Sequence, residues 1–298
     1  MVKRAKNINM FLMDGEVTSK IKCTLSNWTG VIYKIPRHNL SDLKSRPELK
    51  QSGIYFLFGY DDEQQRTAYI GQATTRKNGE GILLRVQEHT RDNHSDYFNE
   101  AIILTTQNNS FGPTEISYLE NKFTQLATEA NRYIIRNGNE PNSGNVTEEK
   151  QSELDEVVEN TKDIVGALGY RLFVPLIQTD KKKASGETTL EQMFILKQKV
   201  RRSSIEVTAT GQQTSEGFVV LAGSVIELTE GEQIPKAIQK LRRDLEQKGV
   251  VKNRILQENQ LFNSPSYAAA FVLGRNTNGR IDWKNSEGKT LKEIEENL

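Results

Sequence analysis

The chain has 298 residues, of which 36% are hydrophobic and 27% are charged. Its 40 Lys and Arg against 39 Asp and Glu give a net charge of +1, so a nucleic-acid partner would require locally concentrated basic residues. A single cysteine excludes an intrachain disulfide and a multi-thiolate metal site, and no apolar run approaches the roughly 20 residues that span a bilayer, so we expect a cytoplasmic protein without a membrane partner.

The first fifty residues are rich in short segments of β propensity. They predict three strands, at residues 9–14, 20–25 and 30–36. Asp14-Gly15 is a turn signal between the first two. Residues 39–50 predict a helix that Pro47 breaks or restarts. We interpret residues 1–50 as an N-terminal β-rich arm.

Residues 51–145 alternate between strand and helix patterns. Gly53–Gly59 and Ala68–Gly71 are apolar runs joined by a polar loop, which predicts an antiparallel hairpin. The elements expected after it are a helix at 82–90, a strand at 101–105 and a helix at 113–130. Residues 137–145, rich in Asn and Gly, end this part, which we interpret as one α+β domain.

The next part predicts a helical linker at residues 146–190. Residues 147–164 predict an acidic helix. Residues 171–177 predict an edge strand, because Pro175 cannot donate to a β ladder.

Residues 191–298 predict a small C-terminal α+β domain. Its pattern indicates short alternating strands from Met193, helices at 234–248 and 264–274, and a hairpin strand after Asn278-Gly279.

Tyr55 and Tyr69 are the first candidate functional residues, because each lies beside an isoleucine and a glycine on one strand of the hairpin. A glycine inside a strand usually marks close approach by another backbone or a ligand. Two such tyrosines can bring their hydroxyls to one site. The alternative is a pair of half-buried strand tyrosines with their hydroxyls in water.

Two helices carry further candidates. Arg85 and His89 are four residues apart and share a helix face, where a guanidinium can hold a phosphate; the alternative is a solvated face. On the second helix, Glu115 and Glu120 lie equally far from the centre of the apolar stripe, so periodicity does not choose between them as a ligand.

Taken in order along the chain, these short motifs resemble the GIY-YIG endonuclease domain. The matching residues are Gly53-Ile54-Tyr55, Tyr69-Ile70-Gly71, Arg85 with His89, Tyr118-Leu119-Glu120, and Asn137 before Pro141. The ordered combination is specific and covers residues 52–141. The resemblance implies an α+β fold with a small central antiparallel sheet flanked by helices.

The ends of the chain resemble a bacterial and phage subgroup in which a GIY-YIG domain precedes a domain of unknown function. The segments that carry this similarity are LSNWTG (25–30), IPRHNL (35–40), FVVLAGS, LFNSPSYAAAFVLG and NGRIDWK. The tail is also similar to a domain attached to restriction enzymes and adenine methylases.

The resemblance implies a metal site and a phosphate site. Glu120 would be the metal ligand, since the family places a glutamate directly after the leucine, and Mg²⁺ or Mn²⁺ would be the cofactor. Tyr55 would act as general base with help from Tyr69, and Arg85 would hold the scissile phosphate. His89 would assist positioning or proton transfer. Asn137 corresponds to a supporting asparagine, with Asn139 close to it in the sequence.

We therefore expect a divalent-metal-dependent endonuclease that hydrolyses phosphodiester bonds of nucleic acid, with DNA as the expected substrate. The alternative is a catalytically silent nucleic-acid-binding protein or a regulatory interaction protein. The near-neutral net charge keeps that alternative open.

Overall fold

The computed structural model describes residues 5–91, 98–138, 144–177, 193–200 and 203–297. The chain divides into two compact units, Met1–Pro175 and Leu176–Leu298. Each unit combines a β-sheet with helices, so the expected α+β class is confirmed. The division differs from the four parts that the sequence predicts, because the expected arm and most of the expected linker belong to the first unit.

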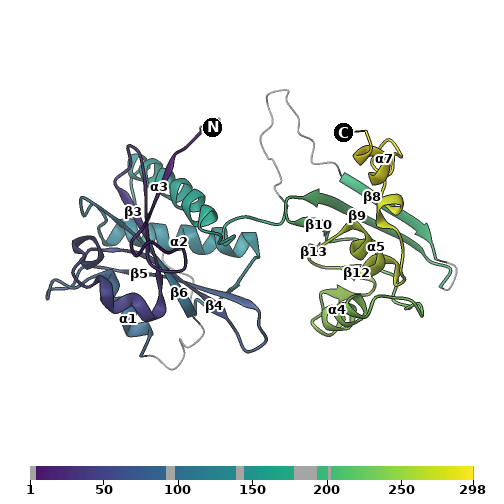
Figure 1. Ribbon diagram of the computed structural model, residues 1–298, viewed down its shortest axis with the longest axis horizontal. Helices are drawn as coiled ribbons and strands as arrows, with labels where there is room; N and C mark the ends of the chain where they lie inside the picture. Colours follow the sequence, from purple (N-terminus) through teal and green to yellow (C-terminus); the bar gives the residue numbers. More distant parts are fainter. Residues whose placement is uncertain (1–4, 92–97, 139–143, 178–192, 201–202, 298) are drawn as a thin grey trace. The chain divides into compact units, whose positions relative to one another are not determined.

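The first unit is built on a seven-stranded sheet with the strand order β1-β2-β3-β6-β4-β5-β7 (Figure 1). The strands are β1 (Ile8–Leu12), β2 (Ile21–Leu25), β3 (Gly30–Pro36), β4 (Gly53–Tyr60), β5 (Arg66–Ala73), β6 (Phe98–Thr106) and β7 (Ile134–Ile135). Neighbouring strands are antiparallel except β5 and β7, which are parallel. The hairpin predicted from the sequence is formed by β4 and β5.

The expected N-terminal arm is wrong as a separate part, because its strands extend this sheet. β3 pairs with β6 along its whole length, from Gly30 to Pro36. Val31 and Ile32 point to opposite faces of the sheet, and both are fully buried. A strand that is apolar on both faces must lie inside a sheet that is covered on both sides.

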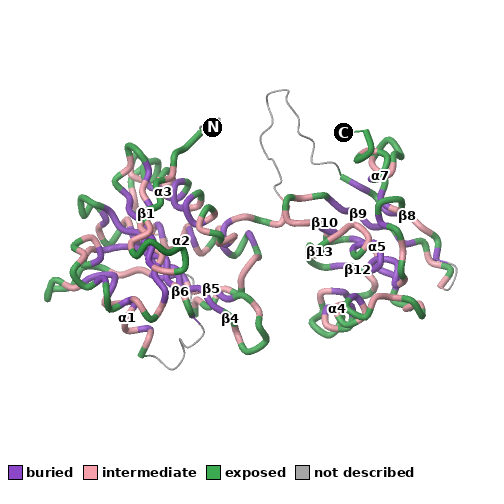
Figure 2. The backbone as a smooth tube through the Cα atoms, viewed as in Figure 1, coloured by how far each residue is buried: buried purple, intermediate pink, exposed green. Residues whose placement is uncertain are grey.

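Helices cover both faces of the sheet, so the buried backbone lies between them (Figure 2). One face packs against α2 (Pro113–Ala130) and α3 (Glu148–Ala167), and it contributes Phe56 and Ile70 to the core. The other face packs against α1 (Ile82–His89) and the 3₁₀ helices η1 (Arg37–Leu43) and η2 (Pro47–Lys50). The helix predicted at 39–50 is thus two 3₁₀ turns, with Pro47 starting the second.

The segment expected as a linker is instead part of the core of the first unit. On α3, Leu154 and Val158 are buried in the same cluster as Phe56 and α2. Leu172 and Phe173 follow in that cluster, and they are not in a strand, contrary to the prediction for 171–177. Burial of two adjacent side chains at one core explains the irregular backbone, since a strand would turn them to opposite faces.

The LSNWTG segment forms a tight turn between β2 and β3. Asn27 has a left-handed backbone with a φ of 59°, which asparagine tolerates well. Trp28 then lies over Gly30, where an added Cβ would come within 2.1 Å of the indole ring. The structure explains this motif by turn geometry and packing.

The second unit contains a four-stranded sheet in the order β13-β10-β9-β8 and a small two-stranded sheet. Its strands are β8 (Met193–Lys199), β9 (Glu206–Thr214), β10 (Gly217–Val220), β11 (Val251–Lys252), β12 (Ile255–Leu256) and β13 (Gln260–Phe262). Its helices are α4 (Lys236–Gln247), α5 (Pro265–Leu273), α6 (Gly279–Asp282) and α7 (Leu291–Glu295). The predicted helices at 234–248 and 264–274 are confirmed as α4 and α5.

The predicted hairpin strand after Asn278 is wrong, because Asn278 caps the short helix α6. Its side chain accepts a hydrogen bond from the Arg280 backbone N–H at 3.2 Å. Gly279 packs on the Pro265 carbonyl, to which the Trp283 indole also donates at 3.0 Å. The contacts of Gly279 and Trp283 with Pro265 therefore hold α6 against the start of α5.

Within the residues that the structure describes, none of the helices has the length and apolar character that a membrane span requires.

Candidate active site

Tyr55 is held inside the first unit by the pairing of β4 with β5. It lies opposite Gly71 in the ladder, and it is 1% exposed. An added Cβ at Gly71 would lie 2.4 Å from both the hydroxyl and the Cζ of Tyr55. Such a distance is far inside van der Waals contact, so only glycine leaves room for the tyrosine hydroxyl at this point.

Tyr69 and His89 complete a cluster of three rings around that hydroxyl. The centroid of the Tyr69 ring lies 6.0 Å from that of the Tyr55 ring and 5.1 Å from that of the His89 ring. The Tyr55 hydroxyl and the His89 Nε2 are 2.8 Å apart, which is a buried hydrogen bond. α1 delivers His89 because its buried side, with Ile82 and Val86, packs on this face of the sheet.

The environment keeps the Tyr55 phenol protonated. Burial, followed by the neighbouring Tyr69, raises the pKa of Tyr55 above its usual value, and Arg85 only partly opposes the rise. At neutral pH the hydroxyl is therefore a neutral group that can donate or accept a proton in its hydrogen bond with His89.

Arg85 lies beside Tyr55 and is oriented by a second arginine through a shared carboxylate. Its guanidinium is 3.3 Å from the Glu88 carboxylate, and its side chain is 42% exposed. Arg76, from the loop after β5, binds Glu88 with both of its terminal nitrogens, at 2.6 and 2.8 Å. Sequence analysis missed Arg76 and Glu88, although the spacing of Arg85 and Glu88 on a helix was visible.

Glu88 should titrate near pH 2 in the folded protein, because the Arg76 hydrogen bonds, and then Arg85, lower the pKa of its carboxyl to about 2. We expect Arg76→Ala to raise this pKa toward the ordinary value near 4.5. A depressed carboxyl pKa stabilises the fold above the unfolded pKa, and that contribution disappears as the pH falls through the folded pKa. Carboxyl ¹³C chemical shifts during an acid titration measure this; an unchanged Glu88 pKa in Arg76→Ala would contradict the pairing.

Glu120 reaches β5 from α2. Its Oε2 accepts a hydrogen bond of 2.9 Å from the Gln72 side-chain amide, and the Ser117 hydroxyl lies 3.3 Å from the same amide nitrogen. Burial raises the pKa of the Glu120 carboxyl, while the Gln72 amide opposes the rise. Glu115, the alternative on the wheel, lies in the first turn of α2 beside Gly112.

Asn137 pairs with the β5 backbone as another strand residue would. Its amide nitrogen donates to the Ile70 carbonyl at 2.7 Å, and its Oδ1 accepts from the Ile70 N–H at 3.1 Å. This continues the short parallel pairing of β7 with β5. The position fits a supporting role, since Ile70 lies between Tyr69 and Gly71. Asn139 and Pro141 lie outside the described residues.

The candidate residues thus converge on Tyr69–Gln72 of β5, but from different sides. Tyr55, Tyr69, Arg85 and His89 gather on the face covered by α1. Gln72 alternates with Gly71 along the strand, so Glu120 approaches from the face covered by α2. The residues that the sequence suggests for one site therefore form two groups, one on each side of β5.

Residues 199–295 match the family model described as a domain of unknown function (DUF4357). Neither a curated protein nor a solved structure matches the chain. The matched residues lie in the second unit and inside the predicted C-terminal domain. The chain is therefore similar to DUF4357 over its last third, and its first unit carries the candidate active site.

Proposed function

We propose that the first unit is a GIY-YIG-type endonuclease that hydrolyses phosphodiester bonds of nucleic acid with a divalent metal, and that DNA is its substrate. The observation that supports this most is the meeting of the motif residues at Tyr69–Gln72, where Gly71 makes room for the Tyr55 hydroxyl. The motifs lie far apart in the sequence and contact β5 from its two faces, so the proposal requires Arg85 and the Glu120 site to reach one phosphate around the Ala73 end of this strand.

Arg85 is the phosphate-binding group of this proposal. Its guanidinium is part-exposed beside the Tyr55 hydroxyl, and a guanidinium can bind two phosphoryl oxygens at once. Arg76 neutralises Glu88, which would otherwise compete with the phosphate for Arg85.

Tyr55 and His89 form the proton path. A neutral phenol is a weak base, so Tyr55 accepts a proton from the attacking water only while it passes its own proton to His89 Nε2. The water oxygen forms the new bond to phosphorus while the bond to the leaving oxygen breaks. The leaving oxygen keeps the electron pair of that bond and takes a proton from solvent, and His89 ends the step as an imidazolium. In this role the raised pKa of Tyr55 does no harm, because phenolate does not accumulate.

Glu120 is the residue that would hold the metal ion. Its carboxylate, which accepts from the Gln72 amide N–H, and the nearby Ser117 hydroxyl are hard oxygen donors of the kind that suits Mg²⁺ or Mn²⁺. A half-buried carboxylate with a raised pKa gains from a cation. Across the described ranges, no three His, Cys, Asp or Glu side chains gather, so water would complete the shell. The ion would supply Lewis-acid stabilisation of phosphoryl charge.

Nicking of supercoiled plasmid tests the proposal. We expect relaxed circles with Mg²⁺ or Mn²⁺, and no product once EDTA removes the metal. Unchanged nicking in EDTA would contradict the metal assignment. Retention of labelled DNA without any cleavage under either metal would favour the catalytically silent binding protein instead.

A further inference from the structure

A groove runs between η1, the end of α1 and the beginning of β6 in the first unit. Its volume is about 870 Å³. Its lining includes Thr18, Pro36, Lys44, Gln87 and Arg91, which follows the end of α1. This groove lies on the flank of α1 that is turned away from Arg85, so it is distinct from the candidate active site.

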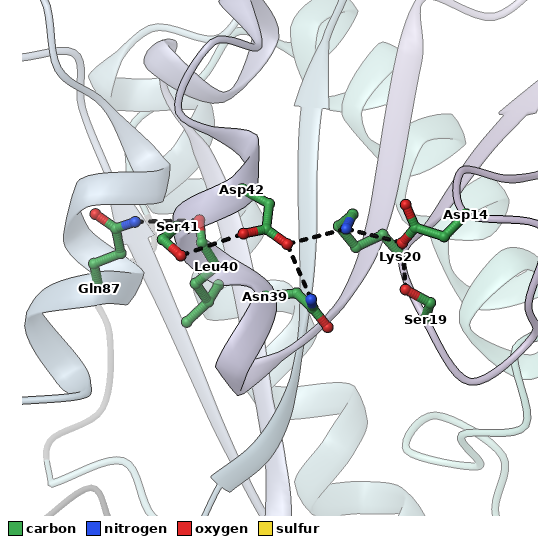
Figure 3. A network of polar contacts seen from close by, with 8 residues as sticks. All are labelled: Asp14, Ser19, Lys20, Asn39, Leu40, Ser41, Asp42 and Gln87. Carbon is green, nitrogen blue, oxygen red and sulfur yellow. Dashed lines mark hydrogen bonds and ion pairs between the residues drawn. The ribbon is translucent and has the colours of Figure 1, made fainter.

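A network of polar contacts holds the η1 wall of this groove in place (Figure 3). The Gln87 amide donates to the Leu40 carbonyl at 3.2 Å, which ties η1 to α1. Asp42 accepts from Lys20 at 3.1 Å, which ties η1 to the start of β2. Because Lys20 also pairs with Asp14, its charge is already balanced. The groove is therefore a built feature of the fold.

Arg37 connects η1 to the beginning of β6 and to the end of α1. Its terminal nitrogens donate to the carbonyls of Phe98 and Thr90, each at 3.3 Å. Its guanidinium also stacks 4.5 Å from the Phe98 ring centroid. These contacts fix a positive charge in the wall and fasten β6 to the end of α1.

Two exposed cations of the groove lining, Lys44 and Arg91, make no ion pair within the described part of the chain. The acidic residue of the lining, Glu100, is committed elsewhere: its carboxylate pairs with Lys34 at 2.9 Å and accepts a hydrogen bond from Tyr170. Among the described residues, no acidic side chain therefore pairs with Lys44 or Arg91.

We infer that this groove binds the phosphodiester backbone of a nucleic-acid strand, which deepens the proposed function and rests on it. Arg37 and Lys44 lie at the two ends of η1 and Arg91 follows α1, so the three cations line a groove much larger than one phosphate. Ten of the twelve lining residues are polar or charged, and three of these carry a positive charge, which suits a polyanionic ligand.

Arg91 lies just past the end of α1, and Arg85 lies on the opposite flank of the same helix. A strand bound in the groove would therefore have to cross the solvent side of α1 to reach Arg85.

Binding of short fluorescein-labelled single-stranded and duplex DNA, measured by anisotropy in EDTA, tests this inference without catalysis. We expect the double variant Lys44→Ala/Arg91→Ala to bind DNA about tenfold more weakly than the wild type, or weaker still. For duplex DNA, the slope of log K against log salt concentration should become shallower by about 1.8, because each lost phosphate contact removes about 0.9. The matched control is Lys236→Ala/Lys240→Ala, which removes the same charge from exposed positions of α4. It should bind like the wild type.

Each other outcome overturns the inference. If the control variant binds DNA as weakly as the groove variant, binding follows the overall charge of the protein. If the wild-type protein binds neither single-stranded nor duplex DNA, nucleic acid is not the ligand of the groove. If the double variant loses affinity for inorganic phosphate but still binds DNA, the groove is a site for small anions. If it loses affinity for polyglutamate alone, the groove is a site for an acidic protein. Failure of the nuclease proposal can be distinguished from failure of this inference. In that case the wild-type protein would not nick plasmid, but the groove variant would still bind DNA more weakly than the wild type.

Discussion

Arg85→Ala and Glu120→Ala should each lower the rate of plasmid nicking by about a thousandfold, because removing one group that stabilises transition-state charge costs roughly 10²–10³ in rate. The Arg85 variant would lose the guanidinium beside Tyr55 that we propose for the phosphate, and the Glu120 variant would lose the carboxylate that we propose for the metal. Both side chains are only partly buried, so the substitutions should leave the fold intact. Initial rates of nicking, with circular dichroism as the folding check, measure this.

Two substitutions of the same chemistry serve as controls for these variants. Arg66→Ala removes an exposed arginine from β5, and Glu129→Ala removes an exposed glutamate from α2. Both should nick like the wild type. Cleavage that persists undiminished in Arg85→Ala and Glu120→Ala would mean that the reaction takes place elsewhere in the protein.

Gly71→Ala should damage both stability and activity. The new methyl group would lie 2.4 Å from the Tyr55 hydroxyl, and Tyr55 is buried on all sides. Overpacking of this kind costs about 1–3 kcal/mol of the free energy of unfolding. A displacement of about 1 Å at a reacting group costs roughly a hundredfold in rate. Urea unfolding and nicking rates measure the two effects separately.

Gly138→Ala is the matched control, since none of the described residues lies within 4 Å of the position of its Cβ and its φ is not positive. It should change neither stability nor rate. The double variant Gly71→Ala/Tyr55→Leu should lose less stability than the two single variants together, because removal of the phenol removes the collision. A Gly71→Ala protein with wild-type stability would show that the hydroxyl does not lie against Gly71.

Local patterns in the sequence predict the elements that carry the site. The apolar runs around Tyr55 and Tyr69 predict the β4–β5 hairpin, and the apolar stripes of residues 82–90 and 113–130 predict α1 and α2. These patterns succeed because each element buries its own apolar side on the sheet. The face that Arg85 shares with His89 follows from the same helical period.

Long-range pairing explains what the sequence does not predict. The joining of β3 to β6 depends on strands some seventy residues apart, and no local pattern encodes it. The cap at Asn278 forms because Gly279 meets the Pro265 carbonyl, so a turn signal there became a helix start. The placement of Glu120 across β5 from Arg85 likewise depends on which face each helix covers.

The central position of β6 limits how the first unit can be dissected. A fragment cut at residues 51–145 would leave β6 without β3 and would strip α3 and Phe173 from the Phe56 side of the sheet. A bare central strand and an uncovered apolar face are prone to aggregate. Limited proteolysis or recombinant expression of the first unit should therefore preserve everything from β1 through Pro175 as one indivisible folding module.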